Sequence, residues 1–129
     1  MRIITGKARG AKLATLEGEA TRPTAERTKE AIFSVIRSKI AGARVLDLFA
    51  GSGQLGLEAL SQGAEHAVFC DAAKRAVDVI RSNVEKTRMQ DAAEVLCADW
   101  QVALKRFAGR EQFDLVFLDP PYAMGLLPQ

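Results

Sequence analysis

The sequence predicts an α/β fold in which helices pack against a parallel β-sheet. Short apolar runs, of the length of buried strands, alternate with longer stretches whose apolar residues recur at helical spacing. A glycine-rich turn separates the first of these runs from the helix after it. This order is typical of a sheet that binds a ligand at the carboxyl ends of its strands. The length of 129 residues fits one domain of this kind.

The apolar runs predict four strands, at residues 44–49, 66–70, 94–97 and 113–118. The stretches between them predict three helices, at residues 54–62, 72–88 and 99–107. Parallel strands joined through helices bring their carboxyl ends to one edge of the sheet. Polar residues that directly follow the strands are therefore expected to lie close together.

The first 40 residues are organised differently. Residues 2–4 and 12–16 predict a small hairpin or arm. Pro23 and the threonines beside it predict the start of a helix that runs to about residue 40. We divide the chain into an arm at 1–20 and a domain at 21–129. The apolar face of that helix is expected to comprise Ala25, Ile32, Phe33, Val35, Ile36 and Ile40. The charged residues expected to face outward are Glu26, Arg27, Lys29, Glu30 and Arg37.

Charge is distributed unevenly along the chain. Residues 1–40 contain nine Lys and Arg against four Glu, a net charge of +5, whereas the whole chain carries only +2. A basic arm on a mildly acidic body indicates a polyanionic partner, although the charge alone also fits an ordinary solvated surface. No apolar run is long enough to span a bilayer. The two cysteines lack metal-ligand spacing, so we expect reduced thiols, no metal site and a cytoplasmic protein.

The glycine-rich turn contains a G-x-G-x-x-G pattern made by Gly51, Gly53 and Gly56. Asp71 ends the next strand, where an acid can bind ribose hydroxyls. This pattern fits a dinucleotide almost as well as S-adenosylmethionine. Asp47, four residues before Gly51, favours the second ligand because its negative charge would repel a pyrophosphate and attract an ammonium group.

A second motif, Asp119-Pro120-Pro121-Tyr122, follows the fourth strand. The prolines end strand pairing and hold the backbone rigid. The Asp119 carboxylate and the Pro120 carbonyl are two acceptors that suit a planar NH2 group. They can align its nitrogen with a methyl donor and stabilise the positive charge that develops. Tyr122 offers a face on which the target base can stack.

Asp99 and Trp100 follow the third strand. Asp99 is expected to accept a hydrogen bond from the adenine amino group of the donor, with Trp100 packed nearby. Asp99 also suits the N-cap of the next helix, and the two roles are compatible.

Three blocks of this sequence resemble the bacterial 16S rRNA guanine-N2 methyltransferases of the RsmD family. They are Arg-Pro-Thr-x-x-Arg-x-x-Glu-Ala-x-Phe at 22–33, Leu-Asp-x-Phe-Ala-Gly-Ser-Gly-x-Leu-Gly-x-Glu-Ala-Leu at 46–60, and Asp-Pro-Pro-Tyr. The resemblance implies a Rossmann-like class I S-adenosylmethionine-dependent methyltransferase that acts on one guanine of the small ribosomal subunit or its assembly intermediate.

The resemblance also implies roles for individual residues. Those expected to bind the donor are Thr24, Asp47, Phe49, Gly51, Ser52, Gly53, Asp71, Asp99 and Trp100. Those expected to hold the target base are Asp119, Pro120, Pro121 and Tyr122. Those expected to meet RNA phosphates are Arg9, Arg22 and Arg27.

Members of the family continue past Asp-Pro-Pro-Tyr with further helices and strands, whereas this sequence ends seven residues after Tyr122. The resemblance therefore implies a C-terminally truncated domain whose fourth strand has an open edge, through which copies could associate. Other interpretations remain open. They are methylation of adenine N6 or of a glutamine amide, a nicotinamide oxidoreductase, and an inactive RNA-binding form.

Overall fold

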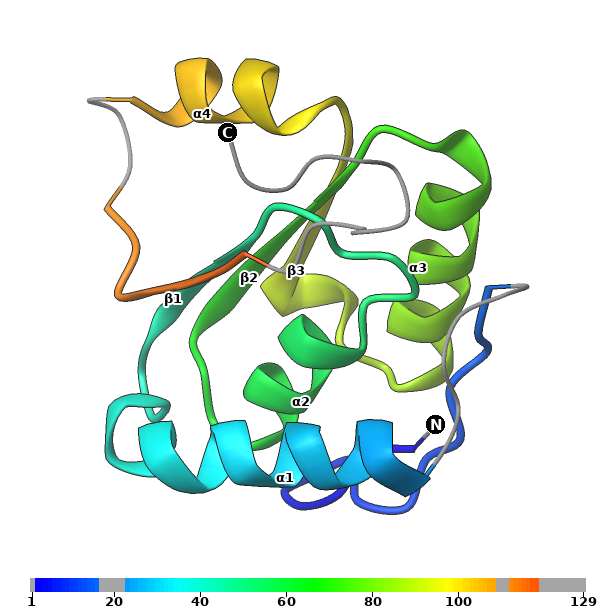
Figure 1. Cartoon of the computed structure of the whole chain (residues 1–129), viewed down its shortest axis with the longest axis vertical. Coiled ribbons are helices and arrows are strands. Elements are labelled where there is room, and N and C mark those ends of the chain that lie inside the picture. Colours follow the sequence, from blue (N-terminus) through cyan, green and yellow to red (C-terminus); the bar gives the residue numbers. More distant parts are fainter. Residues whose placement is uncertain (1, 17–22, 109–111, 119–129) are drawn as a thin grey trace.

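The protein is an α/β sandwich built on a four-stranded parallel sheet, as the computed structural model shows for residues 2–16, 23–108 and 112–118 (Figure 1). The strand order is β3-β2-β1-β4, and each neighbouring pair is parallel. The strands are β1 Arg44–Asp47, β2 His66–Asp71, β3 Ala93–Cys97 and β4 Leu115–Phe117. The α-helices are α1 Pro23–Ile36, α2 Gln54–Ser61, α3 Lys74–Lys86 and α4 Trp100–Phe107. Two 3₁₀ turns span Arg37–Lys39 and Gln90–Ala92. The predicted fold class and element order are confirmed.

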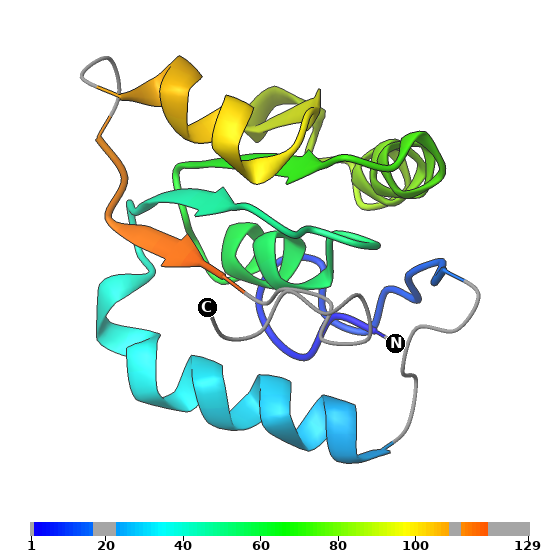
Figure 2. The same ribbon diagram turned by 45° about the horizontal axis from the view of Figure 1, so that its top comes forward.

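Helices cover both faces of the sheet (Figure 2). On one face, α1, α2 and α3 enclose the larger core, in which Phe69 of β2 and Leu57 of α2 are fully buried. On the other face, α4 packs Ala103 and Phe107 against Val68 of β2. Strands that are apolar on both faces are typical of a parallel sheet. The order of the strands reverses at β1, so the carboxyl ends of β1 and β4 flank the position where such sheets bind ligands.

The arm at the amino end joins the larger core. Residues 2 and 12 form an isolated antiparallel bridge, and the Ile3 amide donates to the Ala11 carbonyl at 2.9 Å. Ile3 and Leu13 are buried among the core residues. Burial of these two apolar side chains fixes the arm to the body of the protein. The division of the chain at residue 20 stays a prediction.

Helix α1 differs from the prediction in which residues it buries. Phe33 and Ile40 are buried as expected, and the Phe33 ring contacts that of Phe117 with centroids 5.7 Å apart. The expected outward position of Lys29 is wrong, because its side chain is only 2% exposed. The expected apolar face is wrong at Val35, which is 83% exposed, and Ile32 is also at the surface. The buried face therefore runs through residues 29, 33 and 36. It includes the charge of Lys29, which can be buried because Glu58 of α2 forms an ion pair with it.

Two further observations concern the surface. None of the helices within the described ranges has both the length and the apolar character needed to cross a bilayer. Strand β4 stands at one edge of the sheet as far as the structure describes it, with Val116 and Leu118 exposed. Association of copies through this edge stays a prediction.

Candidate functional site

The carboxyl ends of β1, β2 and β3 bring three of the predicted donor-binding acids to one edge of the sheet. Asp47 ends β1, Asp71 ends β2, and Asp99 follows β3 by two residues. The loop after β1 crosses this edge, and its Ala50 amide donates to the Cys70 carbonyl at 2.9 Å. The loop is therefore fixed over the end of β2.

The glycines of this loop are required by its geometry. Gly51 and Gly53 have φ angles of 58° and 85°, in the left-handed region that favours glycine. Gly53 is also the N-cap of α2. A side chain at Gly56 would overlap the ring of Phe69, so this glycine allows α2 to lie close to β2. The first two glycines shape the loop, and the third permits the packing beneath it.

Asp71 holds the loop from the side of β2. One of its carboxylate oxygens accepts a hydrogen bond from the Gly51 amide at 3.0 Å, and the other accepts one from the Ala73 amide at 2.9 Å. The side chain is partly exposed. A carboxylate has about four acceptor positions, so Asp71 can also accept bonds from ligand hydroxyls. This is the role predicted for it at a ribose.

Asp47 places negative charge inside the protein at this edge. Its side chain is 1% exposed. Burial, and then the nearby Asp47 carboxylate, raise the pKa of the Cys70 thiol to about 12. The Asp47 charge, which adds to burial in disfavouring a thiolate at Cys70, would also disfavour a phosphate nearby and favour a cation. The acid and the glycine loop together fit the ammonium end of S-adenosylmethionine better than a pyrophosphate.

Asp99 acts as the N-cap of α4, which is the alternative role that the sequence left open. Its Oδ1 accepts a hydrogen bond from the Val102 amide at 2.9 Å. Trp100, the next residue in the sequence, is exposed. A contact of Asp99 with a donor adenine remains compatible with capping and stays a prediction. Phe49 is half-buried in the glycine loop, and Ser52 is fully buried there.

Sequence reasoning missed a polar residue that contacts the glycine loop. The amide nitrogen of Asn83, in α3, donates to the Ser52 carbonyl at 2.9 Å. Asn83 follows Ile80 by three residues on the apolar face of α3, and it is fully buried. A polar side chain on the apolar face of a helix indicates a buried hydrogen-bond partner, and this signal was available in the sequence.

For several of the predicted site residues the structure gives no position or no side chain. Asp119, Pro120, Pro121, Tyr122 and Arg22 lie outside the described residues. Thr24 lies in α1, but its side chain is not described. Their roles stay predictions. Strand β4 nevertheless pairs Phe117 with Asp47, so the Asp-Pro-Pro-Tyr motif begins two residues beyond the partner of a predicted donor-binding acid.

The basic residues that the structure does describe lie at the surface. Arg9, on the arm, and Arg27, on α1, are both exposed. Exposed guanidinium groups can reach phosphates of a bound nucleic acid. Their predicted contacts with RNA stay untested.

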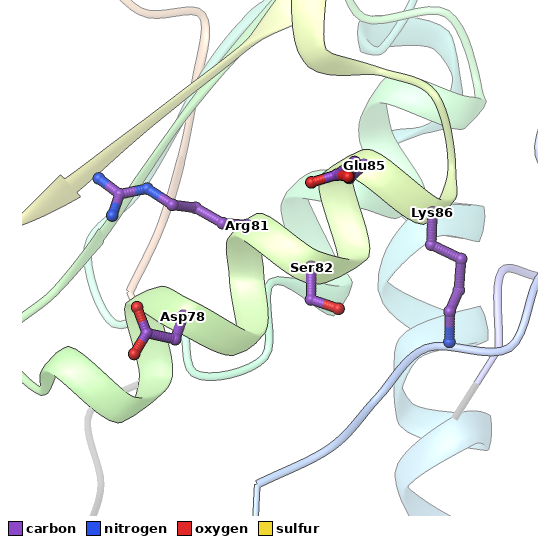
Figure 3. Close-up of a pocket in the computed structure, with 5 residues that line it drawn as sticks. All are labelled: Asp78, Arg81, Ser82, Glu85 and Lys86. Atoms are coloured by element: carbon purple, nitrogen blue, oxygen red, sulfur yellow. The ribbon is translucent and has the colours of Figure 1, made fainter.

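A hollow on the outer face of α3 lies apart from the strand ends (Figure 3). Its lining residues recur every three or four positions along one helix and carry two acids and two bases: Asp78, Arg81, Ser82, Glu85 and Lys86. Such a strip is typical of a solvated helix face. In the part of the chain that the structure covers, no group of three or more His, Cys, Asp or Glu residues is placed to hold a metal ion.

Comparisons with known proteins agree with this geometry. The profile of the family described as Conserved hypothetical protein 95 matches residues 1–129. "Putative rRNA methyltransferase YlbH" of Bacillus subtilis is 45% identical over 123 residues, which are 95% of this chain and 67% of that protein. "Ribosomal RNA small subunit methyltransferase D" of Haemophilus influenzae is 38% identical over 130 residues, which cover 100% of this chain and 67% of that protein.

A solved structure gives the same result for the fold. "Putative methyltransferase yhhF from Escherichia coli" superposes with a TM-score of 0.81 and is 32% identical, covering 98% of this chain and 67% of that one. The chain thus spans about two thirds of the length of these relatives. The names of these relatives describe rRNA methylation or methyl transfer.

Proposed function

We propose that this chain, which belongs to the family described as Conserved hypothetical protein 95, methylates the N2 amino group of a guanine in 16S rRNA. This family is the RsmD family of rRNA methyltransferases. The methyl donor is S-adenosylmethionine. The structural observation that carries the proposal is the buried Asp47 carboxylate beside the glycine loop, because it suits a cationic donor and opposes a pyrophosphate. Since the substrate is rRNA, we expect the protein to act in the cytoplasm.

The residues at the strand ends divide the work of binding the donor. Asp47 attracts the ammonium group, and Asp71 accepts hydrogen bonds from ribose hydroxyls while it holds the Gly51 amide. Asp99 accepts from the adenine amino group while its Oδ1 caps α4. The glycines let the backbone approach closely. Phe49, Ser52, Trp100 and Thr24 complete the proposed donor-binding set.

The proposed chemistry takes place at Asp119-Pro120-Pro121-Tyr122. When bound, the donor supplies an electrophilic methyl group on a sulfonium. Asp119 and the Pro120 carbonyl would accept hydrogen bonds from the two N–H groups of the guanine amino group and aim its nitrogen at the methyl carbon. Transfer would form the nitrogen–carbon bond as the carbon–sulfur bond breaks, S-adenosylhomocysteine would leave as a neutral thioether, and the nitrogen would lose one proton to solvent. Asp119 stabilises the positive charge during this step, and Tyr122 stacks on the base.

The exposed cations of the arm and α1 are proposed to hold the RNA. Arg9 and Arg27 are at the surface, and residues 1–40 carry a net charge of +5. Together with Arg22, they would contact phosphates, which position an RNA without reading its sequence. The substrate in this proposal is the small ribosomal subunit or a particle on the way to it.

Analysis of the methylated product tests the proposal. The chain is incubated with tritiated S-adenosylmethionine and unmethylated small ribosomal subunits, and the rRNA is digested to nucleosides. Tritium in N2-methylguanosine is the expected result. Tritium in N6-methyladenosine, or in a protein glutamine, would favour an alternative acceptor instead. Calorimetric binding of NAD but not of S-adenosylhomocysteine would reject a methyltransferase altogether.

A further inference from the structure

One buried side chain connects the amino-terminal arm to the glycine loop. The amide nitrogen of Asn83 donates to the Ser52 carbonyl and to the Ala14 carbonyl, each at 2.9 Å. The amide oxygen of Asn83 accepts from the Ala14 amide at 2.8 Å. The side chain is fully buried. An asparagine amide has two N–H donors and one oxygen acceptor, and in Asn83 both the nitrogen and the oxygen form hydrogen bonds with main-chain atoms.

The two connected segments belong to different parts of the proposed site. Ser52 lies in the loop over the donor end of the sheet. Ala14 lies in the arm, which carries four exposed cations: Arg2, Lys7, Arg9 and Lys12. In Figure 1 the blue amino-terminal chain runs close to the lower end of α3, the helix that supplies Asn83. Asn83 therefore stands between the segment suited to the donor and a segment suited to phosphates.

Other side-chain anchors of the arm come from α2, and the Lys29 side chain of α1 donates to the Arg2 carbonyl at 2.8 Å; none of these bonds involves the glycine loop. Glu58 accepts hydrogen bonds from the Ile4 and Thr5 amides. The hydroxyl of Ser61 accepts from the Ala8 amide at 2.9 Å and donates to the Thr5 carbonyl at 2.6 Å. These bonds can hold the arm in place without transmitting any change in the loop. Asn83 differs because it contacts Ser52 directly.

We propose that Asn83 is a positioning residue that couples occupancy of the donor site to the seating of the basic arm on RNA. A bound donor restricts the glycine loop, which fixes the Ser52 carbonyl and with it the Asn83 amide. The arm at Ala14 is then held more firmly. Because coupling between two binding sites is reciprocal, RNA bound along the arm raises the affinity for the donor by the same factor. This inference rests on the proposed function.

Hydrogen exchange on the unmodified chain gives the first test, with S-adenosylhomocysteine as the probe. Saturating probe is expected to slow exchange of the Ala14 amide, and of its neighbours at 11–16, by roughly fivefold or more, the lower end of typical coupling. Unchanged exchange at 11–16, in a protein that calorimetry shows to bind the probe, would overturn the coupling. This measurement needs no substitution in a buried position.

Two matched variants give the second test. Asn83→Asp keeps an acceptor for the Ala14 amide but removes both N–H donors. Ser61→Ala removes a different anchor of the arm. Asn83→Asp is expected to lower the affinity for S-adenosylhomocysteine on the order of tenfold. In this variant the probe should no longer change the affinity for RNA. Ser61→Ala is expected to leave both unchanged.

The outcomes separate this inference from the proposed function. If folded Asn83→Asp, checked by circular dichroism, retains the full effect of the probe on RNA affinity, or if both variants change it equally, Asn83 only clips the arm to the core. If the unmodified chain binds no S-adenosylhomocysteine, the proposed function itself fails and takes this inference with it. If the chain binds S-adenosylhomocysteine but this binding changes neither exchange in the arm nor the affinity for RNA, only the role of Asn83 is rejected.

Discussion

Lys29 and Glu58 form an ion pair inside the protein, with 3.2 Å between the Lys29 Nζ and the Glu58 Oε1. Their side chains are 2% and 0% exposed. Glu58 also accepts from two amides of the arm and from the Gln62 side chain at 2.8 Å, and Lys29 donates to the Arg2 carbonyl at 2.8 Å. The pair thus joins α1, α2 and the arm. A buried charge of this kind is tolerated because each partner is satisfied.

Neutralising the acid of this pair should destabilise the protein strongly. We expect Glu58→Gln to lower the free energy of unfolding by about 3–5 kcal/mol, because Lys29 is left as an uncompensated buried charge. Urea unfolding measures the change. The matched control is Asp78→Asn, which breaks the exposed Lys74–Asp78 pair and should cost less than about 1 kcal/mol. Equal costs for the two variants would contradict the structural role of the pair.

Asp71 should matter for donor binding because it holds the loop and is proposed to accept hydrogen bonds from the donor ribose. In Asp71→Asn only one side-chain oxygen remains, so either the Gly51 amide or the Ala73 amide meets an N–H donor and the pair of bonds that Asp71 makes is broken. We expect the affinity for S-adenosylhomocysteine, measured by calorimetry, to fall roughly tenfold to a hundredfold. Asp91→Asn is the control, since Asp91 is exposed at the amino end of β3. An undiminished affinity in Asp71→Asn would remove Asp71 from the donor site.

The two cysteines should differ in reactivity. Burial raises the pKa of Cys70 to about 12, whereas Cys97 is exposed. At pH 8 an aromatic disulfide reagent should therefore modify one thiol in the native protein and two in urea. Rapid modification of the native Cys97→Ser variant would contradict this account of Cys70.

The raised pKa of Cys70 also fixes the sign of a pH effect. A group whose pKa is higher in the folded state contributes stability that is complete below the pKa of the unfolded chain, about 8.5 for a cysteine. That contribution is lost as the pH rises toward the folded value of about 12. Unfolding free energies measured across this alkaline range should fall accordingly.

Removal of a charge that is proposed to contact RNA should change the salt dependence of RNA binding. We expect Arg27→Ala to weaken binding to small-subunit RNA and to make the slope of log affinity against log salt shallower by about 0.7–0.9, the loss of one phosphate contact. Arg106→Ala removes the same charge from α4, on the opposite face of the sheet, and should leave the slope unchanged. Identical slopes for Arg27→Ala and the parent chain would mean that Arg27 does not contact RNA phosphates and has only a structural role.

Much of the fold follows from local patterns in the sequence. Apolar runs and helical periodicity predicted the order of strands and helices, and Gly51 and Gly53 lie in the predicted glycine-rich turn, where both have left-handed φ angles. Lys29 was misassigned because its burial depends on Glu58, a partner on another helix that periodicity within α1 cannot reveal. Asn83 was overlooked although its position on the apolar face of α3 could be seen in the sequence; only the groups that it binds, in two distant segments, could not be predicted from that helix. Local signals predict elements, but tertiary hydrogen bonds decide where buried polar residues go.

The central claim is that a donor held over β1 meets an amino group held by Asp119. Its most direct test is methyl transfer to unmethylated small ribosomal subunits by the parent chain and by Asp119→Ala, with donor binding measured in parallel. We expect transfer by the parent chain and a loss of at least about a hundredfold in the variant, on the scale of other lost transition-state contacts. Affinity for S-adenosylhomocysteine should stay within about twofold, because Asp119 is proposed to touch the acceptor and not the donor. Transfer by Asp119→Ala at the parent rate would contradict the claim.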